Sequence, residues 1–215
     1  MEKDLGNYRK SYEKSELLLK DTPEHPIELF KTWFNDVDKH FPEEETNAMS
    51  ISTIGLNGYP KSRVVLLKKY TSDGFIFYTN YESEKGQAII NNPKVCLSFF
   101  WPGAERQVII KGIAKKVANS VSDDYFKSRP RGSQFGALVS KQSAVIENRN
   151  VLESKLKALE AEFESIEIQR PQFWGGFIIE PVEIEFWQGR PNRLHDRIHY
   201  KLNNDFSWTK NRLSP

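Results

Sequence analysis

Short segments that alternate apolar and polar residues follow one another from Ala48 onward, and this pattern constrains the fold more than any other feature of the chain. The turn sequences Asn57-Gly58 and Ser72-Asp73-Gly74 separate the first of these segments and are typical of β-hairpins. Strands joined by tight turns pair as antiparallel neighbours. The strands expected in this meander are residues 49–54, 63–70, 75–79, 95–101 and 107–117.

More strands are expected towards the end of the chain, at residues 176–179 and 182–187 and in a hairpin of residues 198–202 and 206–212. Many antiparallel strands with few helices favour a mainly β fold, a closed or split β-barrel, over a parallel α/β sheet. No glycine-rich loop joins a strand to a helix. This absence argues against a Rossmann or P-loop nucleotide site.

Helical spacing of apolar residues predicts an amphipathic helix over residues 26–37, with Pro26 in the first turn, where proline is tolerated. Ser83 can cap a short helix that continues to Ile90. Two further helices are expected at residues 122–128, ended by Arg131-Gly132, and at residues 151–163. The helices are therefore expected to flank the sheet.

The first 20 residues are charged and weakly patterned, which predicts a flexible N-terminal arm or an isolated helix rather than core. No linker, repeat or low-complexity tract divides the remainder. Residues 21–215 are therefore expected to form a single domain.

Composition excludes several classes of function. The 31 Lys and Arg nearly balance the 29 Asp and Glu, so no global charge favours nucleic acid or an anionic membrane. The single cysteine, Cys96, lies in an apolar run and is expected to be a buried, inert thiol. One cysteine and no signal peptide indicate a cytoplasmic protein, and no apolar run has the roughly 20 residues of a membrane span. The four histidines have no spacing typical of a metal site.

The segment 186–197 concentrates Trp, Gln, His and Arg around the turn-forming Gly189 and Pro191. Arg193, His195 and Arg197 share a period of two and would point to one face if the chain forms a strand there. Such groups repel one another unless an anion or an electron-rich partner lies opposite. The alternative is a solvated loop with surface arginines.

Other polar groups could bind anions or a ring. Arg63 and Lys68 end an apolar run and, at odd spacing, would serve two different anions on opposite faces, or simply be exposed charges. Tyr125, Arg129 and Ser133 are four residues apart and would converge on a phosphate if they share one side of a helix; the alternative is a surface helix end. Gln107 and the segment 140–143 could bond the heteroatoms of a ring.

Together these segments resemble the pyridoxamine 5'-phosphate oxidase family, from about Arg9 to the terminal Arg212-Leu-Ser-Pro215. The last of the matching motifs resembles the family's own signature. The motifs that carry the resemblance are Arg63-Val-Val-Leu-Leu-Lys68, Phe77-Tyr-Thr-Asn80, Arg106-Gln-Val108, Tyr125-Phe-Lys-Ser-Arg-Pro130, Ser140-Lys-Gln-Ser143, Phe173-Trp-Gly-Gly176, Phe186-Trp-Gln-Gly189 and Arg193-Leu-His-Asp-Arg197.

The resemblance implies an FMN-binding split β-barrel that works as a homodimer with FMN at the subunit interface. It implies oxidation of pyridoxamine or pyridoxine 5'-phosphate by O2 to pyridoxal 5'-phosphate, with release of peroxide. By the resemblance, the residues expected to contact FMN are Arg63, Val64, Lys68, Tyr78, Thr79, Lys85, Gln107, Gln142, Ser143, Trp187 and Arg197. Those expected at the substrate are Lys68, Tyr125, Arg129, Ser133, Arg193, His195, Arg9 and Tyr12, with Arg193 and His195 assigned catalytic roles.

The chain departs from the family pattern at Ser83-Glu84-Lys85, where the family usually carries Ser-Arg-Lys. Glu84 either weakens FMN binding or points to solvent. Arg9 and Tyr12 match residues that form a mobile cover over the substrate in the family, and Glu45 stands near a position that is often acidic. Two other functions stay open: a different split-barrel flavin enzyme, and a non-catalytic protein that binds flavin or pyridoxal phosphate.

Overall fold

The computed structural model describes residues 2–164 and 166–215, so Met1 of the predicted arm lies outside the described residues. Internal contacts divide the chain into two compact units. Unit 1 comprises Met1–Ser50, Leu97–Lys111 and Pro181–Pro215, and unit 2 comprises Ile51–Cys96 and Gly112–Glu180. The single domain over residues 21–215 stays a prediction.

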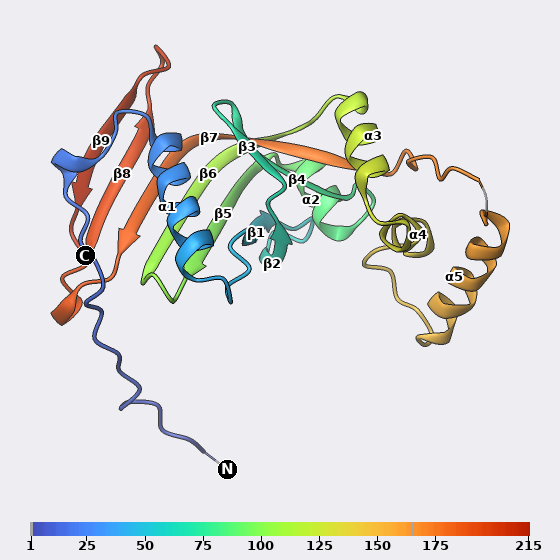
Figure 1. Cartoon of the computed structure of the whole chain (residues 1–215), viewed down its shortest axis with the longest axis horizontal. Helices are drawn as coiled ribbons and strands as arrows, with labels where there is room; N and C mark the ends of the chain where they lie inside the picture. Colours follow the sequence, from blue (N-terminus) through green and yellow to red (C-terminus); the bar gives the residue numbers. More distant parts are fainter. Residues whose placement is uncertain (1, 165) are drawn as a thin grey trace. The chain divides into compact units, whose positions relative to one another are not determined.

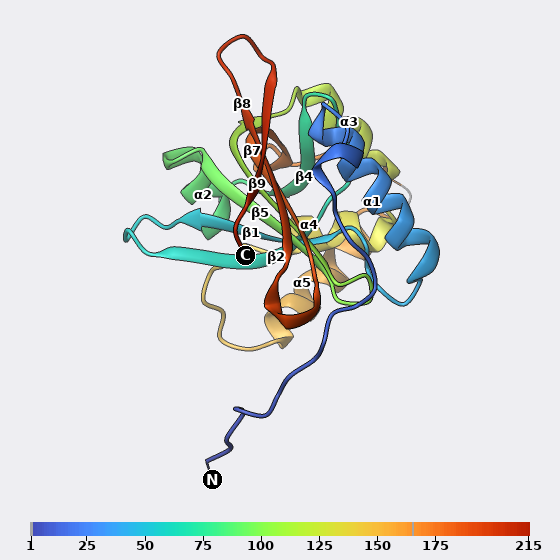
Figure 2. The same cartoon turned by 90° about the vertical axis from the view of Figure 1, so that its left-hand side faces the viewer.

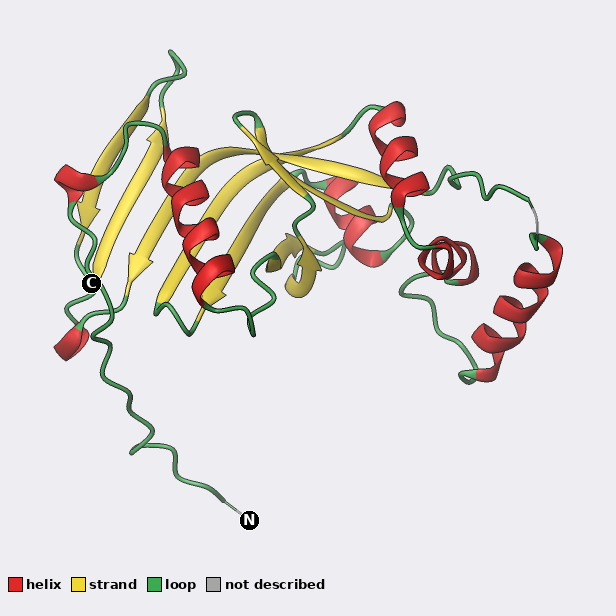
Figure 3. Cartoon of the chain, viewed as in Figure 1, coloured by secondary structure: helices red, strands yellow, loops and turns green. Residues whose placement is uncertain are grey.

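Nine strands in the described part of the chain form one sheet (Figure 3). The order of hydrogen-bonded neighbours is β2-β1-β5-β6-β7-β4-β3, and β8 pairs with β7 and with β9. The pairs β3–β4, β4–β7, β7–β8 and β8–β9 are antiparallel. The strands are β1 (Ala48–Ile54), β2 (Pro60–Leu66), β3 (Lys69–Thr71), β4 (Gly74–Asn80), β5 (Lys94–Trp101), β6 (Arg106–Lys116), β7 (Trp174–Gln188), β8 (Asp196–Leu202) and β9 (Trp208–Leu213).

In unit 1, helix α1 (Pro26–His40) packs its apolar face on the strands (Figure 1). The ring of Phe30 lies 5.2 Å from that of Phe99, and the ring of Trp33 lies 5.3 Å from that of Phe186. These aromatic contacts form the core of the unit. Strands β8 and β9 continue as a long two-stranded ribbon (Figure 2). Two short 3-10 helices, η1 (Leu19–Asp21) and η2 (Pro191–Arg193), complete the unit.

In unit 2, helix α2 (Glu84–Asn91) begins at Ser83, whose side chain accepts the backbone N–H of Gly86, as predicted for a capping serine. Three more helices follow β6: α3 (Asn119–Ser128), α4 (Arg131–Val139) and α5 (Asn150–Glu162). Phe126, Phe135, Ile168 and Trp174 form the buried cluster of these helices. Trp174 of this cluster also lines the candidate site.

The predicted mainly β fold is confirmed, but three predicted boundaries are wrong. The expected strand 63–70 is two strands, β2 and β3, because Leu67 and Lys68 interrupt it. The expected strands 176–179 and 182–187 are one strand, β7, because Pro181 has a fixed φ that an extended chain accommodates. Arg131-Gly132 does not end a helix but begins α4, and the break falls at Arg129, since a residue before proline avoids the helical conformation.

Two smaller expectations also differ from the structure. Leu17, inside the predicted arm, is buried in unit 1. Cys96 is half-buried rather than buried, because it alternates along β5 with the buried Val95 and Leu97. Among the residues that the structure describes, no helix combines the length and apolar character needed to cross a membrane.

Candidate active site

Unit 2 contains a cavity of about 420 Å³, a volume typical of small-molecule sites. Its lining comes from β2 and the residue Lys68 after it, from β4, α2, α3, α4 and the segment after α4, and from the start of β7. The structure brings together nine of the residues predicted for the site. They are Val64, Lys68, Tyr78, Thr79, Lys85, Tyr125, Arg129, Ser133 and Gln142.

Arg129 is the most informative of these residues. It ends α3 with an extended backbone, and its guanidinium lies over the ring of Trp174 at 4.6 Å. Among the described residues, its Nη1 is the buried side-chain polar atom that has no hydrogen-bond partner. Burial lowers the pKa of Arg129, and the nearby Tyr125 opposes that change. A buried polar atom without a partner is costly, and this one belongs to a half-buried cation, so it is suited to an anion that enters the cavity.

The two neighbours predicted to act with Arg129 also line the cavity, although no single helix carries all three. Tyr125 belongs to α3 and Ser133 to α4, and Pro130 separates the two helices. The predicted convergence is therefore achieved by a helix break. Lys68, which follows β2, adds a second cation to the same lining.

Three aromatic rings form a stack on one side of the cavity. The ring of Tyr78 lies 3.9 Å from that of Tyr125 and 5.5 Å from that of Trp174, with interplanar angles of 16° and 9°. Gly176 faces Tyr78 across the β4–β7 pair, and a Cβ there would meet the Tyr78 ring at 2.9 Å. Burial raises the pKa of both phenols, so each keeps its proton and can donate a hydrogen bond.

A second cationic group lies at the start of α2. Lys85 Nζ donates to Gln142 Oε1 at 3.1 Å and to Thr79 Oγ1 at 3.2 Å. Arg63 donates to Thr53 Oγ1 at 2.8 Å and to the carbonyl oxygens of Ile51 and Lys61. Burial is the main cause that lowers the pKa of Lys85, and the charge of Arg63 lowers it further. Two mutually repelling cations are again suited to an anion.

Ser143 and Glu84 complete this region. The Ser143 hydroxyl accepts the backbone N–H of Glu84 at 3.3 Å, and the Ser143 backbone has φ 73°. The Glu84 carboxylate is exposed and forms an ion pair with Lys61 at 2.5 Å. The exposed pair partly offsets the charge that Glu84 introduces, and the pKa of Glu84 is lowered mainly by its hydrogen bond with Lys61.

In unit 1, the predicted residues Tyr12, Trp187 and His195 contact one another. The His195 ring lies 4.7 Å from the Trp187 ring and 5.9 Å from the Tyr12 ring. The backbone N–H of Arg190 donates to His195 Nδ1 at 3.1 Å, which fixes a neutral imidazole with its proton on Nε2. Burial lowers the pKa of His195, the charge of Arg193 lowers it further, and Asp196 opposes both.

The other residues predicted for the site in unit 1 are more dispersed. Arg197 forms a bidentate ion pair with Glu185 at 2.8 and 3.0 Å. Arg193 and Arg9 are exposed, and Gln107 is half-buried on β6. The expected common face of Arg193, His195 and Arg197 is wrong, because β8 begins only at Asp196 and Arg193 has φ 62° in η2.

Sequence analysis gave no role to several residues of the cavity lining. The most important is Trp174, which supports Arg129 and belongs to the noted motif Phe173-Trp-Gly-Gly176. Cation–π contact between residues so far apart in sequence has no local signal. The remaining unassigned lining residues are Val65, Leu66, Asn80, Gly136 and Ala137, whereas Ser140 belongs to the segment 140–143 predicted to bond a ring.

The sheet with its helical insertion defines the chain as a split β-barrel protein. A solved structure of PhzG from Burkholderia lata 383, in complex with tetrahydrophenazine-1-carboxylic acid, superposes with a TM-score of 0.86 at 26% identity, covering 94% of this chain and 100% of that one. A second structure, a pyridoxamine 5'-phosphate oxidase-related, FMN-binding protein from Nostoc punctiforme, has a TM-score of 0.68 at 14% identity over 90% of this chain and 98% of that one. The predicted fold class is therefore confirmed.

Sequence comparison gives the family. The family model described as pyridoxamine 5'-phosphate oxidase matches residues 38–162, and the model of the pyridoxine 5'-phosphate oxidase C-terminal dimerisation region matches residues 174–215. The chain is 64% identical to the pyridoxine/pyridoxamine 5'-phosphate oxidase of Flavobacterium psychrophilum, over 99% of this chain and 100% of that one. It is 54% identical to that of Christiangramia forsetii, over the full length of both. The chain belongs to the pyridoxamine 5'-phosphate oxidase family.

The geometry of His195 predicts a pH dependence of stability. Its pKa in the folded protein lies below the value of about 6.5 in the unfolded chain, so the unfolded chain binds the proton more tightly. The stabilisation is present above that value and is lost as the pH falls through the lowered pKa. We expect His195→Asn, which keeps an acceptor for the Arg190 N–H, to lose less unfolding free energy between about pH 7.5 and about pH 5 than the unmutated protein. Equal losses, measured by urea unfolding, would contradict this expectation.

Proposed function

We propose that the protein catalyses the FMN-dependent oxidation of pyridoxamine or pyridoxine 5'-phosphate by O2 to pyridoxal 5'-phosphate. Hydrogen peroxide is released, together with ammonia from the amine. The observation that carries the proposal is the buried, unpartnered Nη1 of Arg129 in a cavity that also contains Lys68, Tyr125 and Ser133. Relatives that are 64% and 54% identical over nearly the whole chain carry the name of this oxidase.

Arg129 and its neighbours suit the substrate phosphate. A phosphate monoester presents oxygens that accept hydrogen bonds, and guanidinium, ammonium, phenol and hydroxyl groups supply donors and positive charge. Tyr125 keeps its proton because burial raises its pKa. The stacked Tyr78 and Trp174 hold Tyr125 and Arg129 in place at the cavity wall.

The second cationic group suits the phosphate of FMN. Arg63 and Lys85 would hold it, with Thr79, Gln142 and Ser143 as neighbouring polar groups. The pairing of Glu84 with Lys61 explains how the chain can carry an acidic residue there without opposing the phosphate. By the resemblance, Val64, Lys68, Tyr78, Gln107, Trp187 and Arg197 complete the FMN contacts.

FMN, when bound, supplies the two-electron acceptor and passes the electrons to O2. The protein then has to orient the pyridine ring and stabilise the charge that shifts as the substrate is oxidised. His195 can donate a hydrogen bond from Nε2 because Nδ1 already accepts the Arg190 N–H. Arg193 would cover the pyridine face opposite the flavin, and its left-handed backbone in η2 is the kind of strain found at functional sites.

We further propose that the protein works as a homodimer with FMN at the subunit interface. The match of residues 174–215 to a dimerisation region supports a dimer. Unit 2 also exposes a group of large apolar side chains on the β1–β2 hairpin, and an exposed apolar patch of this kind is typical of an interaction surface. These residues are Ile54, Leu56, Tyr59 and Val64.

Peroxide formation tests the proposed function. Purified protein loaded with FMN should release peroxide from pyridoxamine 5'-phosphate and from pyridoxine 5'-phosphate. Unphosphorylated pyridoxamine should be used with a kcat/KM lower by at least about 100-fold, because charged hydrogen bonds to the phosphate are lost. Flavin binding without turnover would favour the alternative of a non-catalytic flavin or pyridoxal-phosphate binding protein. A protein that neither binds FMN nor turns over after FMN addition would refute the proposal.

The division of roles between Arg193 and the FMN contacts gives a second test. We expect Arg193→Leu to lower kcat by about 100-fold, because a charge near the reacting ring is removed, while the affinity for FMN stays unchanged. Flavin fluorescence on titration measures the affinity, and peroxide release measures turnover. Loss of flavin in Arg193→Leu would show that this division is wrong.

A further inference from the structure

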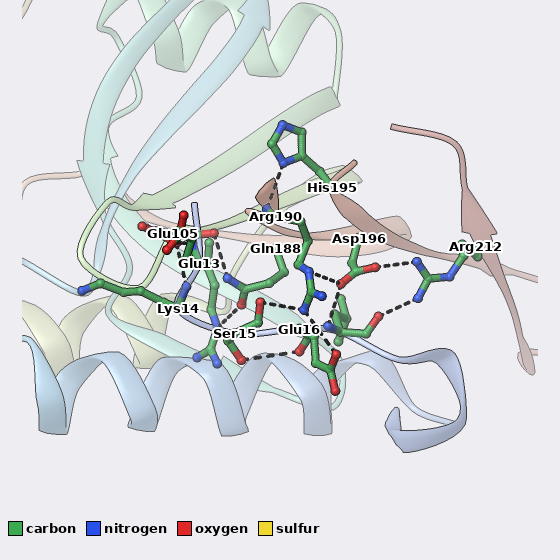
Figure 4. A network of polar contacts seen from close by, with 12 residues as sticks. Glu13, Lys14, Ser15, Glu16, Glu105, Gln188, Arg190, His195, Asp196 and Arg212 are labelled. Carbon is green, nitrogen blue, oxygen red and sulfur yellow. Dashed lines mark hydrogen bonds and ion pairs between the residues drawn. The ribbon is translucent and has the colours of Figure 1, made fainter. Parts of the chain in front are cut away.

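The segment of residues 10–17, here called the N-terminal strap, has no helix or strand but is tied closely to unit 1. Its backbone groups are bound by side chains from distant parts of the sequence (Figure 4). Leu17 donates its N–H to Asp196 at 3.0 Å, and its carbonyl oxygen accepts from Arg212 at 2.8 Å. Arg190 donates to the Ser15 carbonyl oxygen at 3.3 Å. The position of the strap is therefore set by side chains and not by secondary structure of its own.

Glu105 contacts the part of the strap nearest to its N-terminal end. One oxygen of its carboxylate, Oε2, accepts the backbone N–H of Glu13 at 2.8 Å and that of Lys14 at 3.1 Å. The other oxygen lies 3.6 Å from Lys10 Nζ. The residue is 2% exposed, and a carboxylate so deeply buried is costly unless hydrogen bonds compensate for lost water. The strap supplies that compensation.

The backbone of Glu105 is held as firmly as its side chain. It lies in the turn between β5 and β6 with φ 56°, which few residues other than glycine adopt. Its carbonyl oxygen accepts the N–H of Gly189 at 2.8 Å and a side-chain N–H of Gln188 at 3.2 Å. Glu105 thus connects the strap to the end of β7.

Tyr12, which directly precedes the two anchored amides, lies against the imidazole of His195. Its ring is 5.9 Å from that of His195 and 5.7 Å from that of Trp187, with an interplanar angle of 88° to the latter. Gly189 permits this approach, because a Cβ there would lie 2.7 Å from Tyr12 Cβ and Cγ. Any shift of the amides at residues 13 and 14 would move Tyr12 away from His195.

We propose that Glu105 is a positioning residue, which fixes Tyr12 against His195 and Trp187 by binding the backbone N–H groups of Glu13 and Lys14. The inference rests on the proposed oxidase function, in which His195 faces the substrate, and on the resemblance, which places Tyr12 over the substrate. The carboxylate of Glu105 binds the backbone of the strap and lies near Lys10, so its effect on Tyr12 is exerted through the strap. The competing explanation is that Glu105 only stabilises the fold of unit 1.

A double-mutant cycle with Tyr12 separates the two explanations. Glu105→Ala should raise KM for pyridoxamine 5'-phosphate by about fivefold or more with a smaller change in kcat, since the ordered strap binds substrate in ground and transition states alike. The double variant Glu105→Ala, Tyr12→Ala should be no worse than Tyr12→Ala alone, because the proposed effect of Glu105 on the substrate passes through Tyr12. The proposal would be overturned if the KM of the double variant rose by the product of the two single-variant increases.

Hydrogen exchange of the FMN-loaded protein without substrate supplies a readout that needs no turnover. The amides of Glu13 and Lys14 should exchange about tenfold faster or more in Glu105→Ala, and Glu105→Gln, which keeps an acceptor oxygen, should lie between it and the unmutated protein. Unchanged exchange at these two amides would refute the positioning role. If no variant turns over, the proposed oxidase function fails, while exchange still decides whether Glu105 holds the strap.

Glu44 offers a matched control at the same turn. Its carboxylate accepts the N–H of Gly103 at 2.6 Å, in the β5–β6 turn that also contains Glu105, and the strap makes no part of this contact. Glu44→Ala should lower the unfolding temperature but leave KM and the exchange of residues 13 and 14 unchanged. An equal effect of Glu44→Ala on KM would show that general destabilisation explains the result. If Glu105→Ala does not fold, Glu105→Gln replaces it in the double-mutant cycle with Tyr12→Ala.

Discussion

The contact between the Arg129 guanidinium and the Trp174 ring is the interaction on which the account of the site depends. Arg129 is half-buried beside Trp174, and its buried Nη1 has no hydrogen-bond partner. The flanking structure maintains this arrangement, since α3 ends before Pro130 and the stacked rings of Tyr78 and Tyr125 close one side. A site that keeps a cation unsatisfied in the free protein is prepared for an anionic ligand, and the free energy of that preparation is recovered only when the ligand binds.

Much of the fold could be predicted from local patterns, and the errors have local causes too. Alternation along β1 and β5 predicted half-buried strands correctly, because the side chains of a strand alternate between its two faces. The predictions were wrong where a residue type is compatible with two structures. Pro130 and Gly132 stand at the beginning of α4, where the sequence had suggested only an end, because proline is tolerated in a first helical turn as well as after a last one.

For the site, the prediction was right for one group of residues and wrong for another. Tyr125, Arg129 and Ser133 were expected together, and they line one cavity, although a helix break and not a helix face brings them there. Arg193, His195 and Arg197 were expected on one face by a strand period, but the chain forms η2 and a turn before β8 begins. No local pattern gave a role to Trp174 or Glu105, although Trp174 lies in a noted motif, since their roles depend on partners more than 40 residues away in the sequence.

Equilibrium binding of phosphorylated and unphosphorylated ligand tests whether Arg129 binds the substrate phosphate. With FMN-loaded protein under anaerobic conditions, the account predicts that pyridoxamine 5'-phosphate binds at least about 100-fold more tightly than pyridoxamine, and that Arg129→Gln loses most of this preference while it still binds FMN. Trp174→Phe, which keeps an aromatic ring beneath the guanidinium, should retain the greater part of it. A preference for the phosphorylated ligand that is unchanged in Arg129→Gln would contradict the account.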